Sequence, residues 1–67
     1  MITFKEANQI RIQLKMKLAS YSWYVSSGVF TSAEDYYIGV FVKKIDNNVR
    51  KIISPTINDI SVRIFES

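Results

Sequence analysis

The sequence predicts an α+β domain in which one N-terminal helix packs on a four-stranded, mainly antiparallel sheet. Three observations lead to this class. Apolar residues recur at helical spacing near the N-terminus, aromatic and β-branched residues fill the middle of the chain, and the C-terminal residues alternate between apolar and polar. The 67 residues suffice for a single core, so we assign residues 1–67 to one small domain.

The helix is expected to begin after Thr3, because Thr3 and Glu6 have the spacing of a capping box. The apolar residues that follow lie three or four positions apart, so they share one side of the helix. These residues are Phe4, Ala7, Ile10, Leu14, Leu18 and Tyr21. We expect the helix to end near Ser20, with its apolar side against the sheet.

Two apolar residues do not belong to this stripe. Ile12 and Met16 lie one helical turn apart on nearly the opposite side of the predicted helix. They are either isolated apolar residues on a solvated surface or a small contact patch for a second protein.

Residues 22–30 form the first predicted strand, in which Gly28 marks a bulge or bend. A polar loop at residues 31–35 then connects it to the central strand as a hairpin. The central strand, residues 36–45, presents two different faces. One face is apolar, and the other is aromatic and basic: the first carries Ile38, Val40 and Val42, the second Tyr37, Gly39, Phe41 and Lys43.

The C-terminal part is expected to add two more strands. Residues 46–48 (Asp-Asn-Asn) predict a tight hairpin turn and residues 49–53 a third strand, which ends before Pro55. A second turn at residues 58–59 leads into an alternating strand at residues 60–65. Its apolar side, with Ile60, Val62 and Ile64, is expected to join the core.

One predicted helix covers only one face of the sheet. The other face is therefore expected to be open, although it is too apolar for an ordinary solvated surface. It should carry Tyr37, Phe41, Lys43, Arg63 and Phe65, with either Trp23 or Tyr24, depending on the register of the first strand.

Composition argues against most catalysis. The chain has no cysteine and no histidine, and its glycines are isolated, so the usual nucleophile, general base and phosphate-binding loop are missing. Glu34 and Asp35 are the only adjacent acidic pair, and such neighbours point apart along an extended chain. We therefore expect a non-enzymatic protein with no catalytic residues, no cofactor, no metal and no small-molecule substrate.

Charge and hydropathy bound the partners. The net charge of +3 permits an acidic partner without requiring one. No stretch has the apolar length of a signal peptide or a membrane span, so we expect a cytoplasmic protein that does not bind membranes.

Two functions fit the open face. The first is protein association, as a homodimer or with a larger partner, through the interaction surface Tyr37, Phe41, Lys43, Arg63 and Phe65 and the Ile12 and Met16 patch. The alternative is single-stranded nucleic-acid binding, in which the aromatic rings stack on bases while Lys43 and Arg63 contact phosphates.

Overall fold

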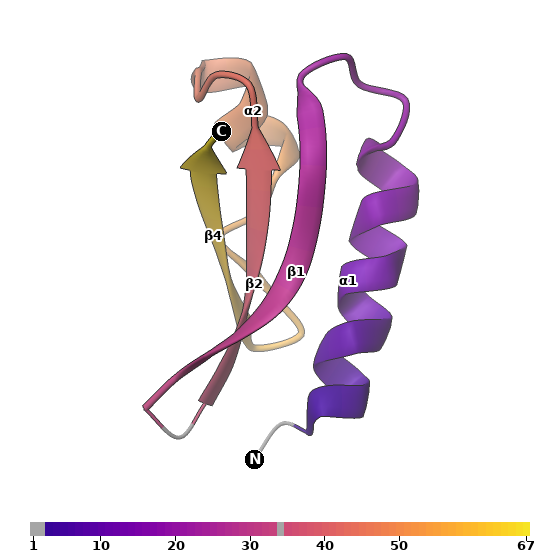
Figure 1. The fold of residues 1–67 in the computed structure, drawn as a ribbon, viewed down its shortest axis with the longest axis vertical. Helices are drawn as coiled ribbons and strands as arrows, with labels where there is room; N and C mark the ends of the chain where they lie inside the picture. Colours follow the sequence, from indigo (N-terminus) through magenta and orange to yellow (C-terminus); the bar gives the residue numbers. More distant parts are fainter. Residues whose placement is uncertain (1–2, 34) are drawn as a thin grey trace.

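The computed structural model describes residues 3–33 and 35–67, and it confirms an α+β fold (Figure 1). The elements, in chain order, are α1 (Phe4–Leu18), β1 (Tyr24–Ser32), β2 (Asp35–Val42), α2 (Asn47–Ile52), β3 (Thr56–Ile57) and β4 (Ile60–Glu66). Glu34, one half of the adjacent acidic pair, lies outside the described residues.

Helix α1 forms as its periodicity predicts. Thr3 is the N-cap, and its side-chain oxygen accepts a hydrogen bond from the Glu6 backbone N–H at 3.2 Å. The middle of the apolar stripe is buried, namely Ala7, Ile10, Leu14 and Leu18. The two ends of the stripe, Phe4 and Tyr21, stay exposed, where Phe4 meets Tyr36 edge-on and Tyr21 stacks on Trp23.

The sheet has the strand order β1-β2-β4-β3 and is mixed. Strands β1 and β2 form the expected antiparallel hairpin, and β3 and β4 form a second one. The turn of that second hairpin, Asn58 and Asp59, has positive φ at both residues, as a type I′ hairpin turn requires. Strands β2 and β4, the two at the centre, run parallel.

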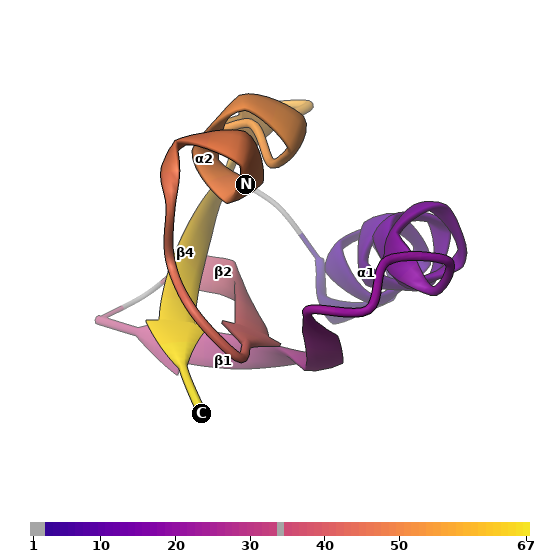
Figure 2. The same ribbon diagram turned by 90° about the horizontal axis from the view of Figure 1, so that it is seen from above.

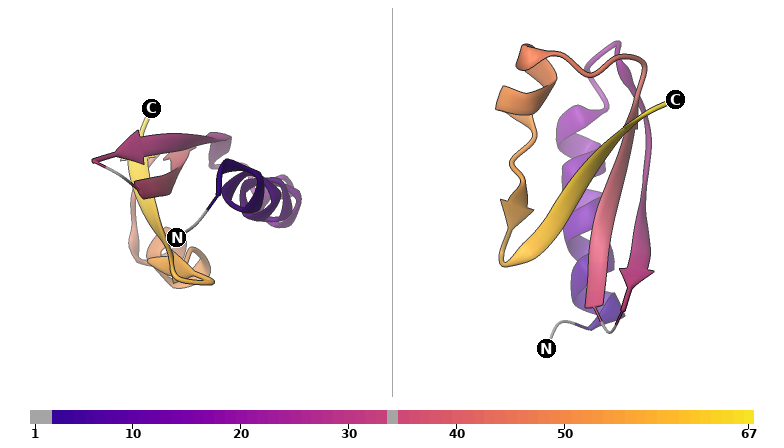
Figure 3. Two further views of the ribbon diagram at one scale, coloured as in Figure 1. Left: turned by 90° about the horizontal axis from the view of Figure 1, so that it is seen from below. Right: turned by 90° about the vertical axis from the view of Figure 1, so that its left-hand side faces the viewer.

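The predicted hairpin turn at residues 46–48 and the third strand at residues 49–53 are wrong. This segment is the helix α2, in which Asp46 is the N-cap and its carboxylate accepts from the Val49 N–H at 2.9 Å. The parallel strands β2 and β4 need a crossover connection. In it, α2 buries an apolar side near the end of β2, and the segment after α2, which includes β3, returns the chain to the start of β4 (Figure 3). Val49 and Ile53, four residues apart, are that buried side.

Both helices lie on the same side of the sheet (Figures 2 and 3). The core between helices and sheet combines α1, α2 and the inner sides of β2 and β4. Its strand residues are Ile38, Val40, Val42, Ile60 and Val62, all predicted from the alternation, while Ile64 is half-buried. The opposite face of the sheet has no helix over it in the part of the chain that the structure describes.

Replacing Asp46 with alanine removes the N-cap of α2. We expect the free energy of unfolding to fall by about 1 kcal/mol, since the Val49 N–H loses its acceptor. Asp46→Asn keeps a side-chain acceptor and should retain most of the stability. Urea denaturation followed by Trp23 fluorescence measures both, and equal stability of the two variants would contradict the capping role.

Candidate functional site

Five side chains gather on the sheet face that points away from the helices. We call this set the aromatic face, and it consists of Phe30, Tyr37, Phe41, Arg63 and Phe65. Strand register brings them together, because Phe30 pairs with Tyr37 across β1 and β2, and Phe41 pairs with Phe65 across β2 and β4. Directly opposite residues on one sheet face have adjacent side chains.

The rings of the aromatic face contact one another. Phe30 stacks on Tyr37 with ring centroids 5.6 Å apart, and Phe41 stacks on Phe65 at 5.5 Å. Phe30 also meets Phe41 edge-on at 6.1 Å, which links the two pairs. These separations suit attractive aromatic contacts.

Arg63 completes the set from the opposite side. Its guanidinium carbon lies 4.3 Å from the centre of the Tyr37 ring, a cation–π contact. Since β1 and β4 flank β2, Tyr37 is held between Phe30 on one strand and Arg63 on the other.

Gly39 lies beneath two of these rings, those of Phe30 and Phe65. A Cβ atom at this position would lie 2.6 Å from Cε2 of Phe30 and 3.3 Å from Cε2 of Phe65. Both rings therefore rest on bare backbone, and only glycine leaves room for them. The chain uses an aromatic side chain to cover a glycine inside a strand.

The aromatic face is nevertheless only partly buried. Phe30 and Phe65 each keep 37% of their surface exposed, while Tyr37 and Phe41 are half-buried. An apolar surface of this kind, next to a single cation, is suited to contact with another macromolecule.

Four of the seven sequence-predicted surface residues come together here: Tyr37, Phe41, Arg63 and Phe65. Lys43 is exposed one residue beyond β2, where its backbone N–H donates to the Trp23 carbonyl at 2.9 Å. Ile12 and Met16 are exposed on α1, which lies on the other side of the sheet. Ile12 and Met16 therefore do not belong to the aromatic face.

Phe30 takes the place that sequence reasoning gave to Trp23 or Tyr24. A bulge between Tyr24 and Ser26 breaks the alternation, so Tyr24 pairs with Val42 of the core side while Phe30 reaches the aromatic face. Trp23 stacks on Tyr21, and the Tyr24 hydroxyl is 2.9 Å from the Ser27 hydroxyl. The bulge or bend predicted at Gly28 is wrong in position, because Gly28 pairs regularly with Gly39 and the irregularity lies between Tyr24 and Ser26.

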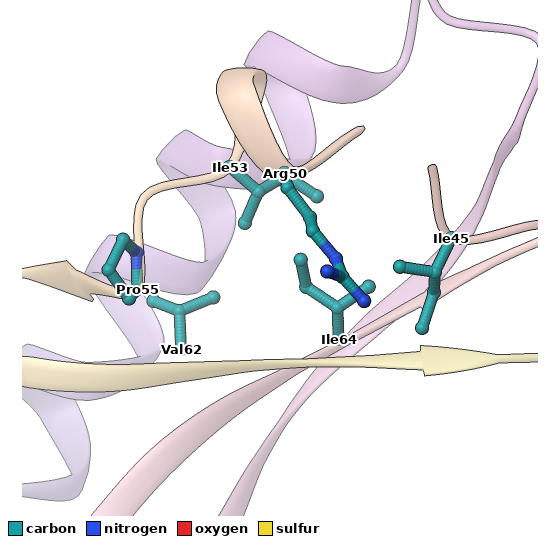
Figure 4. Close-up of a pocket in the computed structure, with 6 residues that line it drawn as sticks. All are labelled: Ile45, Arg50, Ile53, Pro55, Val62 and Ile64. Atoms are coloured by element: carbon teal, nitrogen blue, oxygen red, sulfur yellow. The ribbon is translucent and has the colours of Figure 1, made fainter. Parts of the chain in front are cut away.

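A hollow of about 360 Å³ lies on the helix side of the sheet, between α2 and β4 (Figure 4). Its lining is apolar except for Arg50, and comprises Ile45, Arg50, Ile53, Pro55, Val62 and Ile64. One polar side chain does not make the convergent polar set with which substrate pockets orient a ligand. The hollow is suited to an apolar side chain.

No family model, curated protein or solved structure matches the chain. Across residues 3–33 and 35–67, no three His, Cys, Asp or Glu side chains come together as metal ligands. Nor does any helix in this part of the chain have the length and apolar character needed to cross a bilayer.

Gly39→Ala should destabilise the fold by about 1 kcal/mol, because the new methyl group displaces the Phe30 ring. In a Phe30→Ala background most of this cost should disappear, since the 2.6 Å contact is removed and only the 3.3 Å contact with Phe65 remains. Gly28→Ala is the matched control, with a Cβ at an ordinary 3.4 Å from Phe30. Chemical denaturation of the four-variant cycle measures the coupling, and additive effects would contradict the stacking of Phe30 on Gly39.

Proposed function

We propose that this protein is a small, non-enzymatic association module whose aromatic face packs against a protein surface, in the first instance the same face of a second copy. The observation that carries the proposal is the exposed, mutually stacked ring set over Gly39. It has the aromatic and arginine composition typical of interface centres.

The ring contacts favour association over base stacking. A nucleobase needs an open ring face, and Tyr37 has Phe30 and Arg63 on its two sides. Phe41 and Phe65 likewise cover one face of each other. What remains accessible is ring edges and outer faces, which pack against apolar side chains.

Charge supports the same choice. Arg63 is the one cation within the aromatic face, and its guanidinium already lies on a ring. Two copies that meet face to face would therefore bring few uncompensated charges together. A strand-tracking nucleic-acid groove would need a row of cations along the phosphates.

The expected dimer is weak. Complete burial of a Phe-sized side chain is worth about 1.5–3 kcal/mol, and a ring that is 37% exposed retains roughly a third of that gain for a partner. Two such rings, Phe30 and Phe65, and the two half-buried rings beside them must offset an association cost of similar size on each copy. We expect a dissociation constant of about 100 μM or weaker.

Sedimentation equilibrium up to about 1 mM protein tests the proposal. The weight-average mass should rise toward that of a dimer, and Phe65→Ser should keep it at the monomer value. Ile12→Ser, on α1, is the control and should dimerise as the native chain does. Circular dichroism of each variant confirms that the fold is retained.

A monomer throughout this range would overturn self-association. Labelled oligo-dT and oligo-U at low salt test the alternative, and no binding is expected. Salt-dependent binding that Phe65→Ser abolishes would replace association with single-strand recognition.

A further inference from the structure

Strand β1 is an edge strand, and no other strand among residues 3–33 and 35–67 pairs with its outer side. It is the terminal strand in the order β1-β2-β4-β3, whereas the outer side of β4 is covered at its start by β3. Its nine residues, Tyr24–Ser32, contain no charge and no proline. Exposed strand edges are commonly protected by lysine or proline, and β1 carries neither.

The register identifies the free backbone groups. In an antiparallel ladder, hydrogen-bonded pairs of opposite residues alternate with non-hydrogen-bonded pairs. The Lys43 N–H donates to the Trp23 carbonyl, so this pair is a hydrogen-bonded one and shows which pairs further along β1 and β2 are hydrogen-bonded. After the bulge, Ser26, Gly28 and Phe30 point their N–H and C=O groups toward β2. The residues between them point theirs outward, and these are Ser27, Val29 and Thr31.

Two cationic side chains of α1 lie beside this edge. Helix α1 lies beyond β1 on the side away from β2, above the sheet (Figures 1 and 2). Between the helix and the strand is a hollow of about 170 Å³. Arg11 and Lys15 line it from α1, and residues 24–27 line it from β1.

We propose that the β1 edge binds an extended, acidic segment of another protein as a fifth strand. The outward groups of Ser27 and Val29 would pair with its backbone, which is how sheet edges capture peptides. Every second side chain of the added strand would face α1, where Arg11 and Lys15 favour carboxylates.

Charge also disfavours a second copy as the occupant, because β1 has no acidic residue to meet Arg11 and Lys15 of the facing chain. The site shares no backbone donor with the aromatic face, so either proposal can fail without the other.

The probe is a fluorescein-labelled peptide of about eight residues in which Glu alternates with Thr, a length typical of one strand. Its counterpart replaces each Glu with Lys. Anisotropy titration at low salt should show binding of the Glu peptide alone. Added salt should weaken that binding, because the charges lie near the surface.

Ser27→Pro removes one outward N–H without breaking a bond to β2, and we expect it to weaken binding about tenfold or more. Ser27→Ala is the matched control: it loses the same hydroxyl, including its contact with Tyr24, but keeps the N–H. It should bind as the native chain does. If Ser27→Pro fails to fold, Thr31→Pro with Thr31→Ala repeats the comparison at an exposed position.

Arg11→Gln with Lys15→Gln should also weaken binding, whereas Phe65→Ser should leave it unchanged.

Three results would overturn the proposal. Equal binding of the Glu and Lys peptides would remove the role of charge. Native affinity in folded Ser27→Pro and Thr31→Pro would remove strand addition. A peptide-free dimer that Ser27→Pro, but not Ser27→Ala, converts to a monomer would assign the edge to a second copy.

Discussion

The parallel pairing of β2 with β4 is the constraint on which the rest of the structure depends. Neighbouring parallel strands need a connection that returns to the start of the sheet, and residues 43–59 supply it as α2 and β3. Because α2 must bury Val49 and Ile53 against the sheet, it joins α1 on the side where the core already lies. With both helices on one side, the backbone of the other sheet face is covered only by the side chains of its own strands. The stacked rings over Gly39 follow from this arrangement.

The two candidate surfaces differ in chemistry because they arise from different elements of the sheet. The aromatic face is a set of side chains, assembled across three strands and shielding a glycine backbone. The edge of β1 is a row of backbone groups beside a cationic helix. A partner of the first must be apolar and complementary in shape, whereas a partner of the second must be extended and acidic. As proposed, the two surfaces would serve different partners, since they share no interacting group.

Sequence reasoning succeeded where local pattern and final environment agree. The Thr3 cap and the spacing of Ile10, Leu14 and Leu18 are local signals of α1, and alternation in β2 and β4 identifies their core sides. It failed at residues 49–53, where β-branched residues favour a strand locally but the segment belongs to the helix α2, which Asp46 caps. The spacing of Val49 and Ile53 after Asp46 was a helical signal that strand propensity obscured. Phe30 was missed for a different reason: plain alternation places Tyr24 and Phe30 on one face, and the bulge separates them. A bulge depends on cross-strand register, which a single strand does not encode.

The order of events in folding follows from the same central pair of strands. Helix α1 and the two hairpins contain only local contacts, which form quickly. Pairing of β2 with β4 joins residues as distant as Tyr37 and Ser61, and the entropy of closing that loop is lost before the contacts compensate for it. Phe65 reaches Phe41, and Arg63 reaches Tyr37, only when this closure occurs. We therefore expect this closure to limit the folding rate, and until it happens β2 has a second unpaired edge that can pair with the wrong chain.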